Sequence, residues 1–380
     1  MRIAEALLQW YDGARRELPW RREASPYRTL VSELMAQQTT LAVVVPYFER
    51  FLARFPTLGS LAAASDEDVM ALWSGLGYYA RARNLRRAAV TVVAEHGGAL
   101  PPTVDELRRL PGIGPYTAAA VASIAFGARA FALDGNGARV MARLFGVADP
   151  IDRPGTRARL QALGAAEVPE GRPGDFNQAV MELGALICTP RNPRCEGCPV
   201  GAVCAARARG LSAVLPVRSP KAARPIVRVA CACITDGARV LLVRRGDGLL
   251  SGTWTLPERE LGGPARRKRT ESSAALADAL AAARGLAGDL GVRPTAVVSH
   301  GVVRQIFTHR DVRAEVFRVQ VGAARRLADA PGAGRDTGDV RWLDPAALAE
   351  VGLSSFARKT VALGLGQGLG QKRDTAALRP

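Results

Sequence analysis

Several features that define other classes of protein are missing from this 380-residue sequence. No apolar run approaches the roughly 20 residues that a membrane-spanning helix needs. The N-terminus, MRIAEALLQWYDGARRE, mixes charged and apolar residues at helical spacing, so it lacks the continuous apolar stretch of a signal peptide. We therefore expect a protein that stays in the cytoplasm and has no membrane partner.

Lysine is missing from the first half of the chain: the first lysine is Lys221, and every cationic side chain of the Lys/Arg type before it is arginine. Acidic residues are few by comparison, and the formal net charge of the chain is +17. An excess of this size indicates a polyanionic partner, for which nucleic acid is the natural candidate. The missing lysines exclude a lysine nucleophile from the segment before Lys221.

Hydrophobic periodicity divides the chain into two parts. Over residues 1–210 apolar residues recur at i, i+3 and i+4 between short Gly/Pro stretches, which predicts an all-α domain. Residues 211–225 contain three prolines and are expected to form a connector. Residues 226–362 are expected to form an α+β domain, because the runs IVRVACACI, ARVLLVRR, RAEVFRVQV and VRWLD are strand-like and SSAALADALAAARGL is helical. The first two runs flank an Asp236-Gly237 turn, and the glycine-rich tail 363–380 is expected to be disordered.

Four cysteines form the strongest chemical signal, with C-x6-C-x2-C-x5-C spacing: Cys188, Cys195, Cys198 and Cys204. In a cytosolic protein such a group indicates a metal site rather than disulfides. Zinc and a [4Fe–4S] cluster both take four thiolates, but the spacing is unlike the paired C-x2-C arms of zinc ribbons. The expected role is structural, folding a short loop. Cys231 and Cys233, two apart on a predicted strand, are expected to pack in the core.

Seven stretches between residues 10 and 204 carry a family resemblance: WYDGARRELPWR, YRTLVSELMAQQTT, VVPYFERFLARFP, LWSGLGYYARARNL, LPGIGPYTAAA, LDGNGARV and FNQAVMELGALICTP. In this order, and followed by the cysteines, they resemble the endonuclease III superfamily of DNA glycosylases, and within it the adenine-specific MutY type. The resemblance implies a helix-hairpin-helix over 105–128, a loop with a [4Fe–4S] cluster over 188–204, and a Nudix-like lesion-recognition domain over 226–362. It also implies a monomer that works on the nucleoid, excising adenine opposite 8-oxoguanine or guanine in double-stranded DNA.

The catalytic residues can be argued from the reaction. Breaking an N-glycosidic bond needs a proton for the leaving base and a counter-charge for the oxocarbenium ion. Glu33 lies among apolar residues on a predicted helix, where desolvation should raise its pKa. The resemblance makes Glu33 the acid that protonates adenine, and makes Asp134, with Asn136 beside it, the group that stabilises the cation. The LDGN context of Asp134 also suits a helix N-cap.

Tyr116 decides the type of reaction. In bifunctional members of the superfamily this position holds a lysine, whose amine attacks the sugar and then cleaves the strand. Tyrosine cannot do this, so we expect a monofunctional enzyme that uses water and has little or no lyase activity.

Further residues are assigned to DNA by the resemblance. Base flipping leaves a gap in the base stack that side chains must fill. Gln38 and Tyr78 match the family's wedge residues, which insert into this gap. Gly112 and Gly114 would let the hairpin amides approach a phosphate. Arg21 is expected near the active site, and Arg81 is expected to contact the DNA phosphates. The loop expected to recognise the lesion is Phe307, Thr308 and His309.

Two other functions remain open on the sequence alone. A thymine-mismatch glycosylase of the same superfamily also carries the tyrosine, although such enzymes normally lack a Nudix-like domain. A non-catalytic, DNA-binding iron–sulfur protein would give Glu33 and Asp134 no reason to occur together. We therefore prefer the adenine-specific interpretation.

Overall fold

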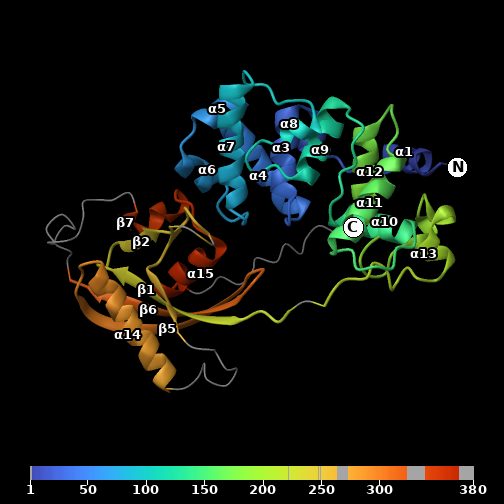
Figure 1. Cartoon of the computed structure of the whole chain (residues 1–380). Helices are drawn as coiled ribbons and strands as arrows, with labels where there is room; N and C mark the ends of the chain where they lie inside the picture. The colour runs from blue at the N-terminus through green and yellow to red at the C-terminus, as the bar shows by residue number, and fades with distance from the viewer. Residues whose placement is uncertain are drawn as a thin grey trace. The chain divides into compact units, whose positions relative to one another are not determined.

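A computed structural model describes residues 2–220, 222–246, 248, 250–262, 273–322 and 339–367. The chain divides into two compact units: one contains Met1–Ala64 and Arg81–Lys221, and the other contains Ser65–Ala80 and Ala222–Pro380 (Figure 1). Within the described residues, no helix combines the length and apolarity that a membrane crossing would need. The predicted tail falls outside the described residues from 368 onward.

The first unit is built from helices with short connections. Their bounds are α1 (Ile3–Ala14), α2 (Pro19–Arg22), α3 (Pro26–Ala36), α4 (Leu41–Arg54), α5 (Leu58–Ala63), α7 (Ala80–Glu95), α8 (Val104–Leu107), α9 (Pro115–Phe126), α10 (Gly135–Leu144), α11 (Pro154–Glu167), α12 (Pro173–Leu186) and α13 (Ala205–Ala208), with 3₁₀ turns η1 (Cys195–Gly197) and η2 (Gly201–Val203). Proline opens α2, α3, α9, α11 and α12, where its missing N–H has no intrahelical partner to lose.

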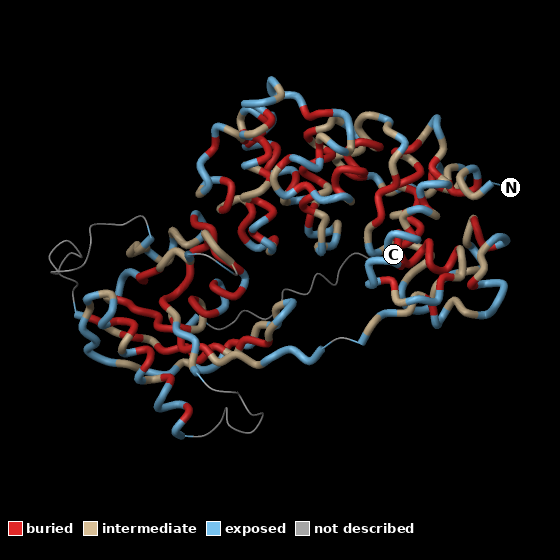
Figure 2. Tube along the Cα trace, in the orientation of Figure 1, coloured by how far each residue is buried: buried red, intermediate tan, exposed pale blue. Residues whose placement is uncertain are grey.

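Helix α12 packs against three other helices of this unit, α1, α9 and α10, while α3 packs against α9. Its apolar side chains Phe176, Val180 and Leu183 are buried with residues of α1, α10 and α11 in one core. The buried segments of α12 and its neighbours appear in red in Figure 2. Polar residues on α12 are therefore held on a rigid element in the interior.

The second unit is a mixed sheet with a helix on each face. Its elements are α6 (Asp66–Leu72), β1 (Ile226–Thr235), β2 (Val240–Arg244), β3 (Trp254–Thr255), β4 (Glu258–Leu261), α14 (Ser273–Asp289), β5 (Pro294–Ile306), β6 (Asp311–Val321), β7 (Val340–Leu343), η4 (Pro345–Ala349) and α15 (Ser355–Gly364). The strand order is β3-β2-β1-β6-β5, with β4 paired to β1 and β7 to β2. Strand β1 runs parallel to β6 and antiparallel to β2 and β4.

The alternation along β1 explains its sequence. Cys231 and Cys233 are buried on the face covered by α15, and Ala230, Ala232 and Ile234 on the face covered by α14 (Figure 1). Both faces are apolar because both are covered. The prediction that these cysteines pack in a core is confirmed.

The predicted fold class, a helical domain followed by an α+β domain, is confirmed. The β1–β2 pairing around Asp236 and Gly237, β6, β7 and α14 also match the predicted elements. Strand β5 was not predicted. Its pattern is broken by a register shift between Ser299 and Gly301, and its outward side chains Val298 and Val302 are apolar and exposed, so neither alternation nor burial marks it.

Two glycines of α11 provide a test of packing in the first unit. A Cβ at Gly164 would lie 2.1 Å from the Phe131 ring, whereas a Cβ at Gly155 would meet nothing within 4 Å. Gly164→Ala is expected to lower the free energy of unfolding by about 2 kcal/mol through overpacking. Gly155→Ala should leave it unchanged or raise it by up to ~1 kcal/mol. Denaturant unfolding of both variants measures the difference, and equal effects would contradict this packing.

Candidate active site

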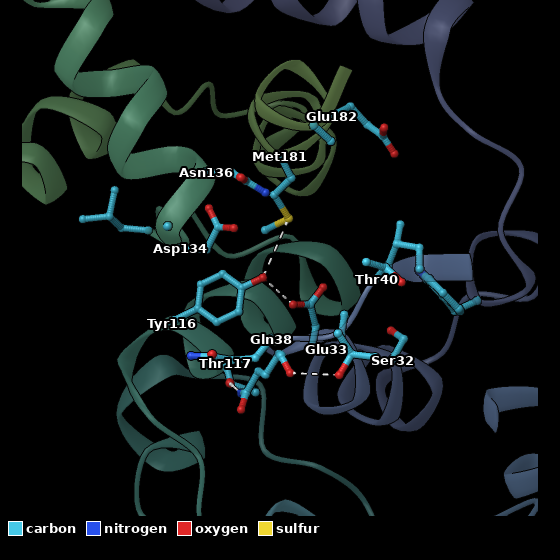
Figure 3. A pocket seen from close by; sticks show the side chains of 18 of the residues that line it. Ser32, Glu33, Gln38, Thr40, Tyr116, Thr117, Asp134, Asn136, Met181 and Glu182 are labelled. Carbon is cyan, nitrogen blue, oxygen red and sulfur yellow. Dashed lines mark hydrogen bonds between the residues drawn. The ribbon is translucent and has the colours of Figure 1, made fainter. Parts of the chain in front are cut away.

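The centre of the site is a hydrogen bond between α3 and α9. The Tyr116 hydroxyl, in the first turn of α9, donates to Oε2 of Glu33 on α3 at 2.6 Å (Figure 3). The Met181 sulfur of α12 lies 3.8 Å from the same hydroxyl. These residues line a cavity of about 810 Å³, which is large enough to hold a nucleoside.

Burial raises the pKa of Glu33 from 4.5 to about 7. The hydrogen bond from Tyr116 opposes this shift, and the nearby carboxylate of Asp134 adds to it. Burial also raises the pKa of Tyr116 well above its usual 10.0. Glu33 can therefore hold a proton near neutral pH, while Tyr116 remains a neutral hydroxyl.

Asp134 lines the same cavity and is the N-cap of α10, as its sequence context predicted. Its Oδ1 accepts a hydrogen bond of 2.6 Å from the backbone N–H of Gly137. Burial raises the pKa of Asp134, but the backbone N–H groups of Gly137 and Asn136 lower it. Of two carboxyl groups in one pocket, the one with backbone donors is better able to remain ionised.

The irregular segment before Asp134 is held by side chains from α11 and α12. Buried Asn177 accepts from the N–H of Ala132 at 2.8 Å and donates to the carbonyl of Ala130 at 2.8 Å. Gln161 donates to the carbonyl of Phe131, and Arg157 to that of Leu133. These contacts satisfy backbone groups that neither a helix nor a sheet satisfies, and they fix the position of Asp134.

Glu182 is an acidic residue of the site that sequence reasoning missed. It is fully buried on α12, and its carboxylate lies 2.7 Å from Nε of Arg16 and 2.8 Å from Nη1 of Arg21. Arg21, expected at the active site, also donates to Gln178 and lies over the Tyr11 ring. Both Glu182 and Arg21 line the cavity. The available signal was the presence of three polar residues, Asn177, Gln178 and Glu182, in a largely apolar stretch of the chain.

The glycine hairpin and Gln38, one of the two expected wedge residues, line the same cavity. Gly112, Gly114 and Gln38 are among its lining residues. Gly112 has φ +73°, and a Cβ there would lie 2.3 Å from the Asn84 side chain, so only glycine fits. Gln38 has φ +60°, a left-handed conformation that is rare for a residue with a side chain. Such strain is concentrated at functional sites.

Tyr78 and the predicted lesion loop meet within the second unit. Tyr78 has φ +50°, is 47% exposed, and its hydroxyl lies 3.5 Å from Oγ1 of Thr308. Thr308 and His309 are exposed between β5 and β6. Phe307 instead packs edge-on against Phe356 of α15, with ring centroids 6.0 Å apart. Phe307 therefore anchors the loop, and the two following residues face outward.

Arg81 is not placed as predicted. We expected it to contact a DNA phosphate, but it is only 8% exposed. Its Nη1 lies 2.6, 3.1 and 2.5 Å from the carbonyl oxygens of Leu34, Met35 and Gln37. The guanidinium thus caps the C-terminal end of α3, where carbonyls lack intrahelical donors.

Three known families match the chain. Residues 31–165 match the HhH-GPD superfamily base excision DNA repair proteins, residues 229–363 the NUDIX domain, and residues 188–204 the iron–sulfur binding domain of endonuclease III. The adenine DNA glycosylase of Mus musculus is 36% identical over 93% of this chain and 76% of its own length. The chain belongs to the adenine DNA glycosylase family.

For other relatives, the match spans a smaller share of the relative's own length. The adenine DNA glycosylase of Homo sapiens is 41% identical over 66% of this chain, and the match spans 56% of the human protein. A solved thermostable thymine-DNA glycosylase is 30% identical, with a TM-score of 0.50, over 54% of this chain and 95% of its own. That structure thus corresponds to about half of the chain.

The cofactor of this glycosylase family member is a [4Fe–4S] cluster, in agreement with the match over 188–204. Cys188, Cys195, Cys198 and Cys204 stand around one small cavity. The described part of the chain has no three His, Cys, Asp or Glu side chains gathered for a single metal ion. Nη1 of Arg143 lies 3.3 Å from the Cys188 sulfur, a contact that suits a thiolate. These four cysteines are the residues that would hold the cluster, whose irons cross-link the loop when bound.

The pKa of Glu33 predicts how stability changes with pH. Between pH 4.5 and about 7 the unfolded chain releases a proton that folded Glu33 retains, so the stability of the wild type falls as pH rises. Glu33→Gln stays neutral and should be more stable than the wild type by up to about 3 kcal/mol above pH 7. Below pH 4.5 the difference should disappear. Urea unfolding at several pH values measures it, and a difference independent of pH would contradict the raised pKa.

Proposed function

We propose that this protein is a monofunctional DNA glycosylase that excises adenine paired with 8-oxoguanine or guanine in double-stranded DNA. It acts as a monomer in the cytoplasm, on the nucleoid, in base excision repair. The observation that carries the proposal is the partly buried Glu33 carboxyl, hydrogen-bonded to Tyr116 and sharing one cavity with Asp134.

The reaction follows from the charges in this cavity. Glu33, protonated near neutral pH, gives its proton to the departing adenine, so that the base leaves as a neutral species. Asp134 carries the negative charge that stabilises the oxocarbenium ion, which water then attacks; the proton that the water loses restores the Glu33 carboxyl. Tyr116 orients the Glu33 carboxyl and cannot form a Schiff base, because it has no amine. The products are free adenine and an intact strand with an abasic site.

Adenine matches two further polar groups that line the cavity, Glu182 and Arg21. Adenine presents an N6 amino donor next to the N1 acceptor. The Glu182 carboxylate can accept from the amino group, and the Arg21 guanidinium can donate to a ring nitrogen. Glu182 is buried and paired with the partly buried Arg21, so their geometry is fixed before the base arrives.

Further contacts with DNA are made in the gap left by adenine and at the opposite base. Gln38 and Tyr78 enter the duplex when adenine is flipped, and stacking on Tyr78 offsets about 1–3 kcal/mol of the unpairing cost. Thr308, within hydrogen-bond distance of the Tyr78 hydroxyl, and the exposed His309 read the lesion. Phe307 holds their loop against α15.

A second candidate is removal of thymine from a mismatch with guanine. It is favoured by one observation, the likeness of the first half of the chain to a thymine-DNA glycosylase. The match of residues 229–363 to the NUDIX domain argues against it, since the solved thymine glycosylase corresponds to only 54% of the chain.

Excision from three duplexes separates these functions. Under single-turnover conditions, adenine opposite 8-oxoguanine should be released, adenine opposite guanine more slowly, and thymine opposite guanine not at all. Nicks should appear only after hot alkali, because water rather than a lysine attacks the sugar. Glu33→Gln, which cannot protonate the base, should lower the rate at least ~100-fold.

Each other outcome overturns a different part of the proposal. Release of thymine would establish the second candidate. Nicks without alkali would contradict the role of Tyr116. No release from any duplex by a folded protein would refute the enzymatic function.

Base reading by Glu182 and Arg21 can be tested without changing the protein. Hypoxanthine has an O6 acceptor and an N1–H donor where adenine has a donor and an acceptor. It should therefore leave an unpaired or repulsive contact at the buried Glu182 carboxylate. Hypoxanthine opposite 8-oxoguanine should be released at least ~10-fold more slowly than adenine in the same single-turnover assay. Equal rates would show that these residues do not read the base.

A further inference from the structure

The turn that carries Gln38 is held in a strained conformation by contacts from other helices. Helix α3 ends at Ala36, and Gln38 follows it with φ +60° and an exposed side chain. A left-handed residue with a side chain costs roughly 1–2 kcal/mol, so the surrounding structure must supply this conformation.

Three side chains fasten Gln37, the residue before it. Nη1 of Arg81 lies 2.5 Å from the Gln37 carbonyl, and the Thr39 hydroxyl donates to the same carbonyl at 3.3 Å. Nε2 of Gln37 donates to the Thr117 hydroxyl on α9 at 3.0 Å. Of these, Arg81 also grips the preceding carbonyls of Leu34 and Met35, so it links the end of α3 to the turn.

We propose that Arg81 is a positioning residue for DNA distortion: by holding the Gln37 carbonyl, it keeps Gln38 in the left-handed conformation from which its side chain enters the duplex. This inference rests on the proposed function, in which Gln38 fills the gap left by the flipped base. Arg81 itself is buried and does not touch DNA. In this proposal it acts before the chemistry, on the conformation of Gln38 rather than on proton transfer.

A matched control is available on the same helix. Nε of Arg86 donates at 2.6 Å to the carbonyl of Ala64, the residue that ends α5. Arg81 and Arg86 are thus both arginines of α7 that cap the end of another helix. They differ in that Arg81 contacts the segment leading to Gln38, whereas the bond from Arg86 goes to α5. A purely structural role would make Arg81→Met and Arg86→Met behave alike.

The first test is a double-mutant cycle on adenine release from the 8-oxoguanine duplex. Arg81→Met and Gln38→Ala should each lower the single-turnover rate at least ~10-fold, and the double variant should be no slower than the slower single variant, because both act through one group. Arg81→Lys keeps a cationic donor but loses the planar guanidinium, so it should recover part of the loss. Arg86→Met should stay within about twofold of the wild type, even where its melting temperature falls as far as that of Arg81→Met.

The second measurement reads base flipping without chemistry. The fluorescent analogue 2-aminopurine replaces the target adenine, and Glu33→Gln prevents its release. Binding should raise the fluorescence in the Glu33→Gln protein, and adding Arg81→Met, but not Arg86→Met, should remove most of the rise.

The inference is overturned if Arg81→Met matches Arg86→Met in rate and fluorescence, or if the losses of Arg81→Met and Gln38→Ala multiply in the double variant. A wild type that releases no adenine would instead refute the proposed function. In that case the fluorescence comparison still decides whether Arg81 governs distortion of the duplex.

Discussion

The hydrogen bond between the Tyr116 hydroxyl and the Glu33 carboxyl joins the two parts of the site that must agree in position. Tyr116 follows the hairpin directly, and Gly112 in that hairpin can carry no side chain because Asn84 fills the space. The hairpin backbone and the Glu33 carboxyl are therefore linked by only the first turn of α9 and one hydrogen bond, which together fix the distance between them. In the proposed reaction, this would fix the position of a phosphate at the hairpin relative to a base protonated by Glu33, with no conformational change needed.

Asp134 depends on a different kind of support. The segment before it is irregular, so its backbone groups would be unsatisfied without Asn177, Gln161 and Arg157. Helix α12 supplies Asn177 to this support and Glu182 to the wall of the cavity. In the proposed reaction, this one helix thus positions both the carboxylate that would meet the sugar and the Glu182 carboxylate that would meet the base. Its polar residues are costly to bury, and each is stabilised by polar partners on neighbouring elements.

The parts of the site that could be predicted from the sequence are those encoded locally. The N-cap of Asp134, the cysteine spacing and the packing of Cys231 and Cys233 each follow from a few adjacent residues. The role of Arg81 could not be predicted in this way, because its partners lie far back in the sequence and only the packing of α7 against the end of α3 brings them together. Glu182 could not be identified from the sequence for the same reason, because its partners Arg16 and Arg21 lie far from it in the chain. Strand β5 was missed because its exposed face is apolar, contrary to the usual alternation.

The absence of lysine before Lys221 has a structural side as well as a chemical one. Arg139 bonds through Nε and Nη2 to the carbonyls of Cys188 and Gly184, and Arg143 through Nε and Nη1 to those of Leu215 and Thr189. A lysine offers its donors from a single point and cannot span such separated acceptors. Part of the basic charge therefore holds the fold together rather than facing DNA. A guanidinium also remains protonated and does not attack a sugar, whereas a lysine amine near this cavity would add strand cleavage. Arginine thus supplies cations to the helical unit without supplying a nucleophile.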